Sequence, residues 1–227
     1  TEYLSQFRFG LPFDEFQQLT IQSAKLLKLL HSQEIIHADI KPQNLMFLKK
    51  NCIKSLRLID FGCAGSPSEI RTYIQSRWYR SPEVLTQTTP YSDKIDIWSL
   101  GCVLFEARTR KYLFHSTNQF QLSLQIASTI GPPNSASQFF VKNTYEFWYK
   151  NKSMLQEIGF TQNTKFYPTE QVLKSMQRCR RDLRAECYNF ELSEGLDVDQ
   201  QVADLISSMV KWEPDERISA EEILDKM

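Results

Sequence analysis

The sequence predicts a mainly α-helical fold with little sheet, and three observations lead to this prediction. Long segments with apolar residues at helical spacing alternate with apolar runs of only two to four residues. The chain has 227 residues, of which 41% are hydrophobic, so it can bury one large core. No repeat, low-complexity tract or linker-like segment divides it, and we therefore expect a single domain.

The first long helix is predicted over residues 13–31. Neither Gly nor Pro interrupts this stretch, and its apolar residues recur at helical spacing, as one expects of an amphipathic helix. They are Phe16, Leu19, Ala24, Leu27 and Leu30. Short apolar runs at 35–36, 45–48 and 56–59 predict small strands, with a turn at 49–51 between the last two.

A second long helix is predicted over residues 93–108. Its core residues lie almost all round the helix, so we expect it to be central and buried. Further helices are expected at about 118–130, 199–210 and 220–226, because Gly-Pro-Pro at 131–133 and Glu-Pro at 213–214 break the pattern there.

Composition and charge argue against several functions. Lys plus Arg equals Asp plus Glu at 27 each, so no overall field favours a direct nucleic-acid partner or an anionic membrane surface. No apolar run approaches the roughly 18 residues of a membrane span, and the first residues lack the pattern of a signal peptide. We expect a cytoplasmic or nuclear protein. The 5 cysteines and 3 histidines lack zinc-ligand spacing, which predicts free thiols and no histidine-built metal site.

Two short motifs carry the chemistry: His-Ala-Asp-Ile-Lys-Pro-Gln-Asn at 37–44 and Leu-Ile-Asp-Phe-Gly at 58–62. Phosphoryl transfer needs magnesium ligands, a cation near the transferred group and a residue that orients the nucleophile. In this order the two motifs resemble the catalytic loop and the DFG element of protein kinases. The resemblance implies a protein kinase-like fold, in which a helical C-terminal lobe carries both motifs on short strands.

The resemblance implies a role for each polar residue of the two motifs. Asp39 would accept the proton of the substrate hydroxyl, and Lys41 would neutralise the transferred phosphate of ATP. Asn44 and Asp60 would bind Mg²⁺ and through it the nucleotide, since oxygen ligands suit this hard cation. Met46 would lie under the adenine ring, or alternatively it is an ordinary core methionine.

Four further residues are expected to hold such a site together. His37 has the chemistry of a base, but the resemblance makes it a packed structural residue bonded to backbone. Glu83 belongs to Ser-Pro-Glu, which stands in place of the usual Ala-Pro-Glu, and should pair with Arg217 of the late Trp-x-Pro-x-x-Arg element. Asp96, in Asp-Ile-Trp-Ser-Leu-Gly, should hold the catalytic-loop backbone by accepting its amides.

The segment 73–83 resembles the end of the activation segment in the CMGC group. Its Ile-Gln-Ser-Arg-x-Tyr-Arg-Ser-Pro-Glu resembles the dual-specificity tyrosine-regulated kinases and their homeodomain-interacting relatives, and His-Ala-Asp is nearest the latter. Ala38 stands where most kinases have an arginine that clamps an activation-loop phosphate, so that form of control should be missing. The resemblance implies that Ser76 contacts the catalytic Asp and Lys and that the substrate is a protein Ser or Thr, often before Pro.

A different phosphate clamp is predicted around Tyr73. Arg77 and Arg80 follow it by four and seven residues, the spacing at which related kinases hold a phosphotyrosine. We expect Tyr73 to be phosphorylated in cis, and an unmodified packed tyrosine is the alternative. Ser66-Pro67 fits a phosphosite or a simple turn. The basic cluster of Arg178, Arg180, Arg181 and Arg184 fits a solvated helix face better than a docking or nucleic-acid surface, because acidic residues interleave it.

The sequence also lacks parts that a kinase needs. Its 7 glycines contain no G-x-G, and the 36 residues before His37 leave no room for a small lobe. We therefore expect residues 1–227 to form a kinase C-lobe, with an activation segment at 60–83 and a CMGC-type insert at about 132–198. The first hypothesis is an ATP- and Mg²⁺-dependent Ser/Thr kinase in the complete protein, the fragment alone being inactive. The alternatives are a binding module or competitor without turnover, and a small-molecule kinase.

Overall fold

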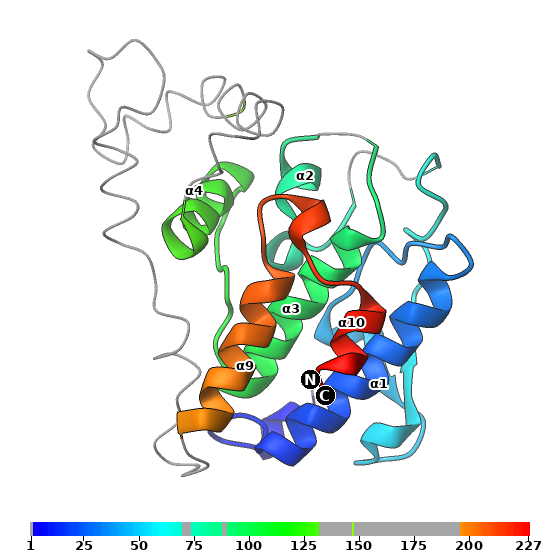
Figure 1. Cartoon of the computed structure of the whole chain (residues 1–227), viewed down its shortest axis with the longest axis vertical. Helices are drawn as coiled ribbons and strands as arrows, with labels where there is room; N and C mark the ends of the chain where they lie inside the picture. The colour runs from blue at the N-terminus through cyan, green and yellow to red at the C-terminus, as the bar shows by residue number, and fades with distance from the viewer. Residues whose placement is uncertain (1, 70–73, 88–89, 132–146, 148–195) are drawn as a thin grey trace.

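The part of the chain that the computed structural model describes is predominantly helical with one small antiparallel sheet (Figure 1). The structure describes residues 2–69, 74–87, 90–131, 147 and 196–227. The helices are α1 (Phe13–His31), α2 (Pro82–Leu85), α3 (Lys94–Thr109), α4 (Gln119–Ile130), α9 (Leu196–Met209) and α10 (Ala220–Asp225). The strands are β1 (Leu45–Phe47) and β2 (Leu56–Leu58), and the 3-10 turns are η1 (Leu4–Gln6), η2 (Pro42–Asn44), η3 (Ile53–Ser55), η4 (Arg77–Tyr79) and η5 (Pro214–Glu216).

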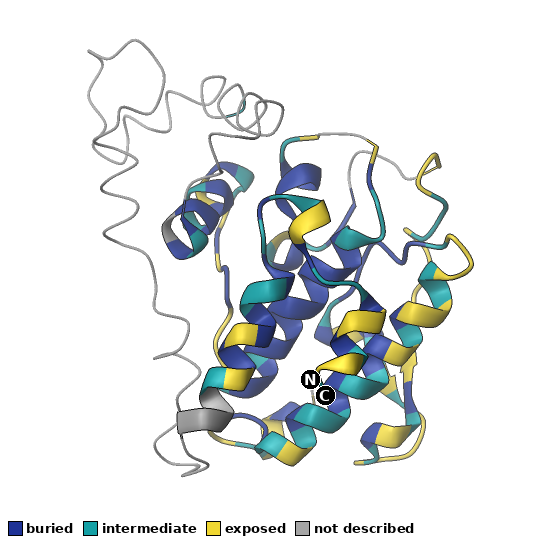
Figure 2. Cartoon of the chain, viewed as in Figure 1, coloured by how far each residue is buried: buried dark blue, intermediate teal, exposed yellow. Residues whose placement is uncertain are grey.

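Helix α3 is the centre of the core. It is buried along most of its length, as Figure 2 shows, and packs against α1 and α9. Trp98 of α3 is fully buried and stacks on Phe114 with ring centroids 5.5 Å apart. A Cβ at Gly101 would come within 3.0 Å of the Val210 side chain, so the absence of a side chain allows α9 to approach closely. The prediction of a central, buried helix is confirmed.

Helices α1 and α10 lie side by side although they come from opposite ends of the chain (Figure 1). Helix α10 begins with a capping box in which Ser219 and Glu222 satisfy each other's backbone amides. The Gln17 side chain of α1 donates to the carbonyl of Met227 at 2.9 Å, which ties the two segments together. The predicted bounds of α1 are confirmed, and those of α10 differ by one residue.

The β1–β2 hairpin brings the two sequence motifs together. Leu45 pairs with Leu58 at the end where the catalytic-loop motif enters the sheet and the Asp-Phe-Gly element leaves it. The Ile59 amide extends this pairing by donating to the Asn44 carbonyl at 3.0 Å. The strand expected at 35–36 is only an isolated bridge between Ile36 and Gly65, because the backbone turns at Ala38 with φ of 61°.

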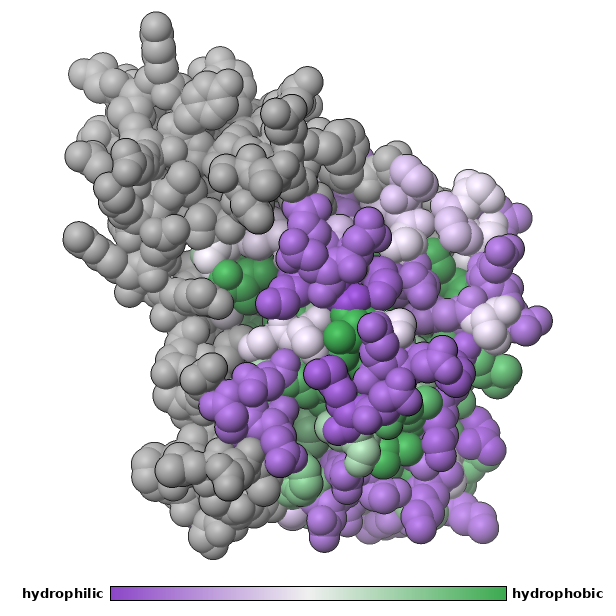
Figure 3. All heavy atoms as spheres, viewed as in Figure 1, coloured by the Kyte–Doolittle hydropathy of each residue, from purple (hydrophilic) through white to green (hydrophobic). Residues whose placement is uncertain are grey.

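The view in Figure 3 shows a mostly hydrophilic face interrupted by hydrophobic patches. None of the helices that the structure describes is long and apolar enough to cross a membrane. Cys52 and Cys102 carry free thiols. Some of the predicted features lie outside the described residues: Tyr73, nearly all of the expected insert at about 132–198 and the arginine cluster within that insert.

Candidate active site

The catalytic-loop residues converge on the carboxylate of Asp39. Its Oδ2 accepts from Lys41 Nζ at 2.6 Å and from Asn44 Nδ2 at 3.1 Å. Its Oδ1 accepts from the backbone N–H and the hydroxyl of Ser76, at 3.0 and 2.8 Å. Lys41 also donates to the Ser76 hydroxyl at 3.1 Å, which closes the network. Pro42 begins the turn η2, whose geometry brings Asn44 back to the Asp39 carbonyl at 2.8 Å.

The environment keeps Asp39 ionised. Burial alone would raise the pKa of this carboxyl, because a low-dielectric surrounding disfavours charge. Hydrogen bonds from Lys41 and Ser76 and the charge of the Lys41 ammonium outweigh burial, so the pKa lies below its ordinary value of 3.8. Asp39 is only 8% exposed, and the result is a buried, charged carboxylate that accepts hydrogen bonds through both oxygens.

The backbone just before Asp39 is anchored by hydrogen bonds to Asp96 of α3. The Asp96 carboxylate is fully buried and accepts from the amides of His37 at 2.8 Å and Ala38 at 2.9 Å. His31, the last residue of α1, lies 3.1 Å from the same carboxylate through Nε2. His31 thereby joins α1 to the loop anchor, a role that the sequence reasoning missed because its partners are 62 and 65 residues further along the chain.

Both ring nitrogens of His37 are engaged with backbone. The Asp39 amide donates to Nδ1 at 3.3 Å, so Nε2 carries the hydrogen and donates to the Ile59 carbonyl at 3.1 Å. The imidazole is fully buried and lies beside the Phe61 ring, with centroids 4.9 Å apart. The geometry therefore suits a structural link between the two motifs and leaves no nitrogen for proton transfer.

Asn44 and Asp60 come from adjacent ends of the hairpin and offer oxygen atoms. Because the Asn44 nitrogen donates to Asp39, its Oδ1 is the atom that remains for a cation. Asp60 is exposed and has a left-handed φ of 65°, with Oδ1 accepting from the Gly62 amide at 3.3 Å. An amide oxygen and a carboxylate are a donor set that fits Mg²⁺.

Met46 follows Asn44 by two residues and lies on β1. It is 48% exposed, so it does not lie in the core of the described residues, and its contact with an adenine ring stays a prediction. Ser66-Pro67 lies in an exposed turn, in which the Ser66 hydroxyl donates to Glu69 at 2.8 Å. That contact fits the turn alternative, and phosphorylation of Ser66 stays a prediction.

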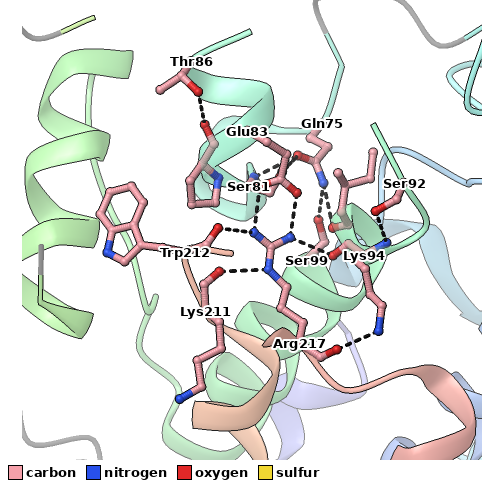
Figure 4. Close-up of polar contacts among 12 residues, drawn as sticks. Gln75, Ser81, Glu83, Thr86, Ser92, Lys94, Ser99, Lys211, Trp212 and Arg217 are labelled. Atoms are coloured by element: carbon pink, nitrogen blue, oxygen red, sulfur yellow. Dashed lines mark hydrogen bonds and ion pairs between the residues drawn. The ribbon is translucent and has the colours of Figure 1, made fainter. Parts of the chain in front are cut away.

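The expected ion pair between Glu83 and Arg217 is present in the interior (Figure 4). The two Nη atoms of Arg217 donate to the two carboxylate oxygens at 2.6 and 2.7 Å. The remaining guanidinium hydrogens reach the carbonyls of Lys94, Lys211 and Trp212. A buried, bidentate and saturated pair of this kind fixes α2 and η5 against α3.

The two arginines of the predicted phosphate clamp are held by backbone oxygens. Arg80 is buried and donates through Nε to the Ile74 carbonyl and through Nη2 to the Gln75 carbonyl, at 3.0 and 2.7 Å. Arg77 is exposed and donates to the Thr117 carbonyl. Tyr73 itself lies outside the described residues, so its phosphorylation stays a prediction.

Comparisons with known proteins agree with this geometry. The family model described as protein kinase domain matches residues 2–227. Homeodomain-interacting protein kinase 4 of Homo sapiens is 33% identical over 232 residues, which cover 92% of the chain and 37% of that relative. Mitogen-activated protein kinase 6 of Oryza sativa subsp. japonica is 33% identical over 214 residues, 93% of the chain and 48% of the relative. The chain thus spans less than half the length of these curated relatives, both of which are CMGC kinases.

Proposed function

The chain belongs to the protein kinase family, and on this premise we propose that the complete protein transfers the γ-phosphoryl group of ATP to Ser or Thr hydroxyls of proteins. The observation that carries the proposal is the convergence of Lys41, Asn44 and Ser76 on the Asp39 carboxylate. These residues supply the charges and the orientation that phosphoryl transfer needs.

In the proposed reaction the chain's own residues orient the reactants and hold the proton. The ionised Asp39 receives the substrate hydroxyl as a hydrogen-bond donor and accepts its proton. Lys41 places its ammonium next to Asp39, where it balances negative charge on the transferred group. Asn44 and Asp60 would hold Mg²⁺, which when bound neutralises the nucleotide phosphates.

We propose that residues 1–227 act as the large lobe of the kinase domain, with 60–83 as activation segment and about 132–198 as insert. Exposed apolar side chains near the hairpin support this: Met46 is 48% exposed, Leu48 65% and Phe61 48%. Side chains of this kind suit an apolar contact with a small lobe and its nucleotide. If turnover were absent from the complete protein, the same surface would favour the binding-module alternative.

A preference for proline after the target residue is the finer part of the proposal. The Gln75 carbonyl is turned towards Arg80, which donates to it at 2.7 Å. We expect this orientation to direct the oxygen away from the backbone amides of a bound substrate. An ordinary residue would bury an unpaired N–H here, whereas proline has none.

The proposal is tested by phosphoryl transfer from radiolabelled ATP with the full-length protein. Two peptides that differ only in Ser-Pro against Ser-Ala serve as substrates, and a Tyr version of the first is the control. We expect transfer to Ser with kcat/KM about tenfold higher for Ser-Pro, corresponding to one unpaired buried amide. No transfer to any peptide would contradict the kinase proposal, and equal rates would contradict the proline preference alone.

A further inference from the structure

The side chain of Gln75 has every hydrogen-bonding position filled, although it lies in the activation segment. Its Nε2 donates to the Ile95 carbonyl and to the Ser99 hydroxyl, both at 2.9 Å. Its Oε1 accepts from the Ser81 amide at 2.8 Å and from the Ser81 hydroxyl at 3.1 Å. A primary amide has two donor hydrogens and two acceptor sites, so this buried amide is saturated (Figure 4).

The backbone of Gln75 is held just as firmly. Its backbone φ of 61° is left-handed, a conformation that residues other than Gly rarely adopt. Its N–H donates to the Ala38 carbonyl of the catalytic loop at 3.0 Å, and its carbonyl accepts from Arg80. The next residue, Ser76, is the one that reaches Asp39. Gln75 therefore connects α3, the activation segment and the catalytic loop immediately before the residue that contacts the reactive carboxylate.

We infer that Gln75 is a positioning residue: its saturated amide fixes the left-handed turn that delivers Ser76 to Asp39 and shapes the adjoining part of the activation segment. The inference rests on the proposed function. It also gives a reason for Ser81 in the Ser-Pro-Glu sequence, because an Ala there would leave one acceptor site of the Gln75 amide unfilled. The contacts involve no phosphate, in keeping with Ala38 at the position of the usual phosphate-binding arginine.

Asparagine, glutamate and alanine would each fail to reproduce the contacts of Gln75. Asparagine is shorter by one methylene and would not span from the segment to Ser99. Glutamate would direct a carboxylate oxygen at the Ile95 carbonyl, where Gln75 now has an N–H. Alanine would remove the contacts to Ile95 and Ser99 of α3 and leave the Ser81 amide unpaired in the interior.

The experiment compares Gln75→Ala, Gln75→Gly and Gln75→Glu in the full-length protein. Gln87→Ala is the matched control, because Gln87 also has a left-handed φ, of 57°, but is exposed. We expect each change at 75 to lower kcat/KM for the peptide by about 10- to 100-fold while KM for ATP stays unchanged. Gln87→Ala should behave as wild type. Glycine relieves the left-handed backbone without restoring the amide, so wild-type kinetics of Gln75→Gly would overturn the inference.

Hydrogen exchange separates this inference from the proposed function, since it needs no activity. The amides of Gln75 and Ser76 should exchange at least tenfold faster in Gln75→Ala than in Gln87→Ala. Unchanged exchange would overturn the inference even in an active enzyme, whereas an inactive wild type with the expected exchange would overturn only the kinase proposal. If Gln75→Ala does not fold, Ser81→Ala takes its place, with an expected loss of about threefold to tenfold in peptide kcat/KM.

Discussion

Replacing Glu83 by Gln should break the buried pair with Arg217 at almost constant volume. The side chains are 4% and 0% exposed, so water cannot take over the lost contact. Arg217 makes five hydrogen bonds, two of them to the carboxylate, and the change leaves its charge in the interior without a counter-charge. Removing one partner of a buried pair costs about 3–5 kcal/mol. For a domain of this size that corresponds to a fall in Tm of about 6–20 °C.

Urea unfolding followed by circular dichroism measures the effect, with the slope m checked for constancy. The exposed pair of Lys28 and Glu221, 2.8 Å apart, is the control, and Lys28→Ala should leave the midpoint unchanged. Arg217→Lys is a second test of the buried pair by the urea midpoint. Lysine keeps the positive charge, but it has only three hydrogen-bond donors and lacks the planar guanidinium that binds both carboxylate oxygens. If Glu83→Gln and Lys28→Ala shift the midpoint equally, the reasoning from burial is refuted.

Three further predictions concern Glu106 of α3, whose carboxylate accepts from the Tyr79 hydroxyl at 2.6 Å, and the residues Asp39 and Tyr73. Burial raises the pKa of Glu106 above its ordinary value of 4.5, despite the hydrogen bond from Tyr79. The contribution of Glu106 to folding stability is therefore greatest below pH 4.5 and is lost as the pH rises. Glu106→Gln should therefore raise the urea midpoint at pH 7 and lose this advantage towards pH 4. The pKa of Asp39 is lowered from its ordinary value of 3.8, so the carboxylate is charged throughout the range from pH 8 to pH 5. Single-turnover rates should therefore show no loss of its proton-accepting role over this range. Mass spectrometry of the full-length protein made in bacteria should find phosphate on Tyr73 in wild type and none in Asp39→Asn; phosphate in both would contradict modification in cis.

Much of the fold could be predicted because the signals are local. The bounds of α1 follow from its apolar stripe, and α4 begins where the Asn118 side chain accepts the Gln121 amide. The burial of α3 follows from apolar residues on all its sides. The prediction of a strand at 35–36 was wrong. Two apolar residues are too few to form a strand, and the left-handed turn at Ala38 ends the pairing.

The residues of the site that belong to the two short sequence motifs could be predicted from the sequence. Asp39, Lys41 and Asn44 are close in sequence, so their meeting needs only one turn. Gln75 escaped notice because its partners lie on α3 and no sequence pattern marks a left-handed glutamine. The one available signal was Ser81 in place of the usual Ala, since a buried hydroxyl needs a partner. The same holds for His31, whose contact with Asp96 appears only once the helices have packed.

The most direct test of the account is transfer of labelled γ-phosphate from ATP to protein Ser or Thr by the full-length wild type and by Asp39→Asn. The substitution keeps shape and removes the proton acceptor, and the urea midpoint of the variant is measured alongside. We expect kcat to fall by about two to four orders of magnitude in a folded variant. A folded Asp39→Asn protein with wild-type turnover would contradict the assignment of the site and the mechanism built on it.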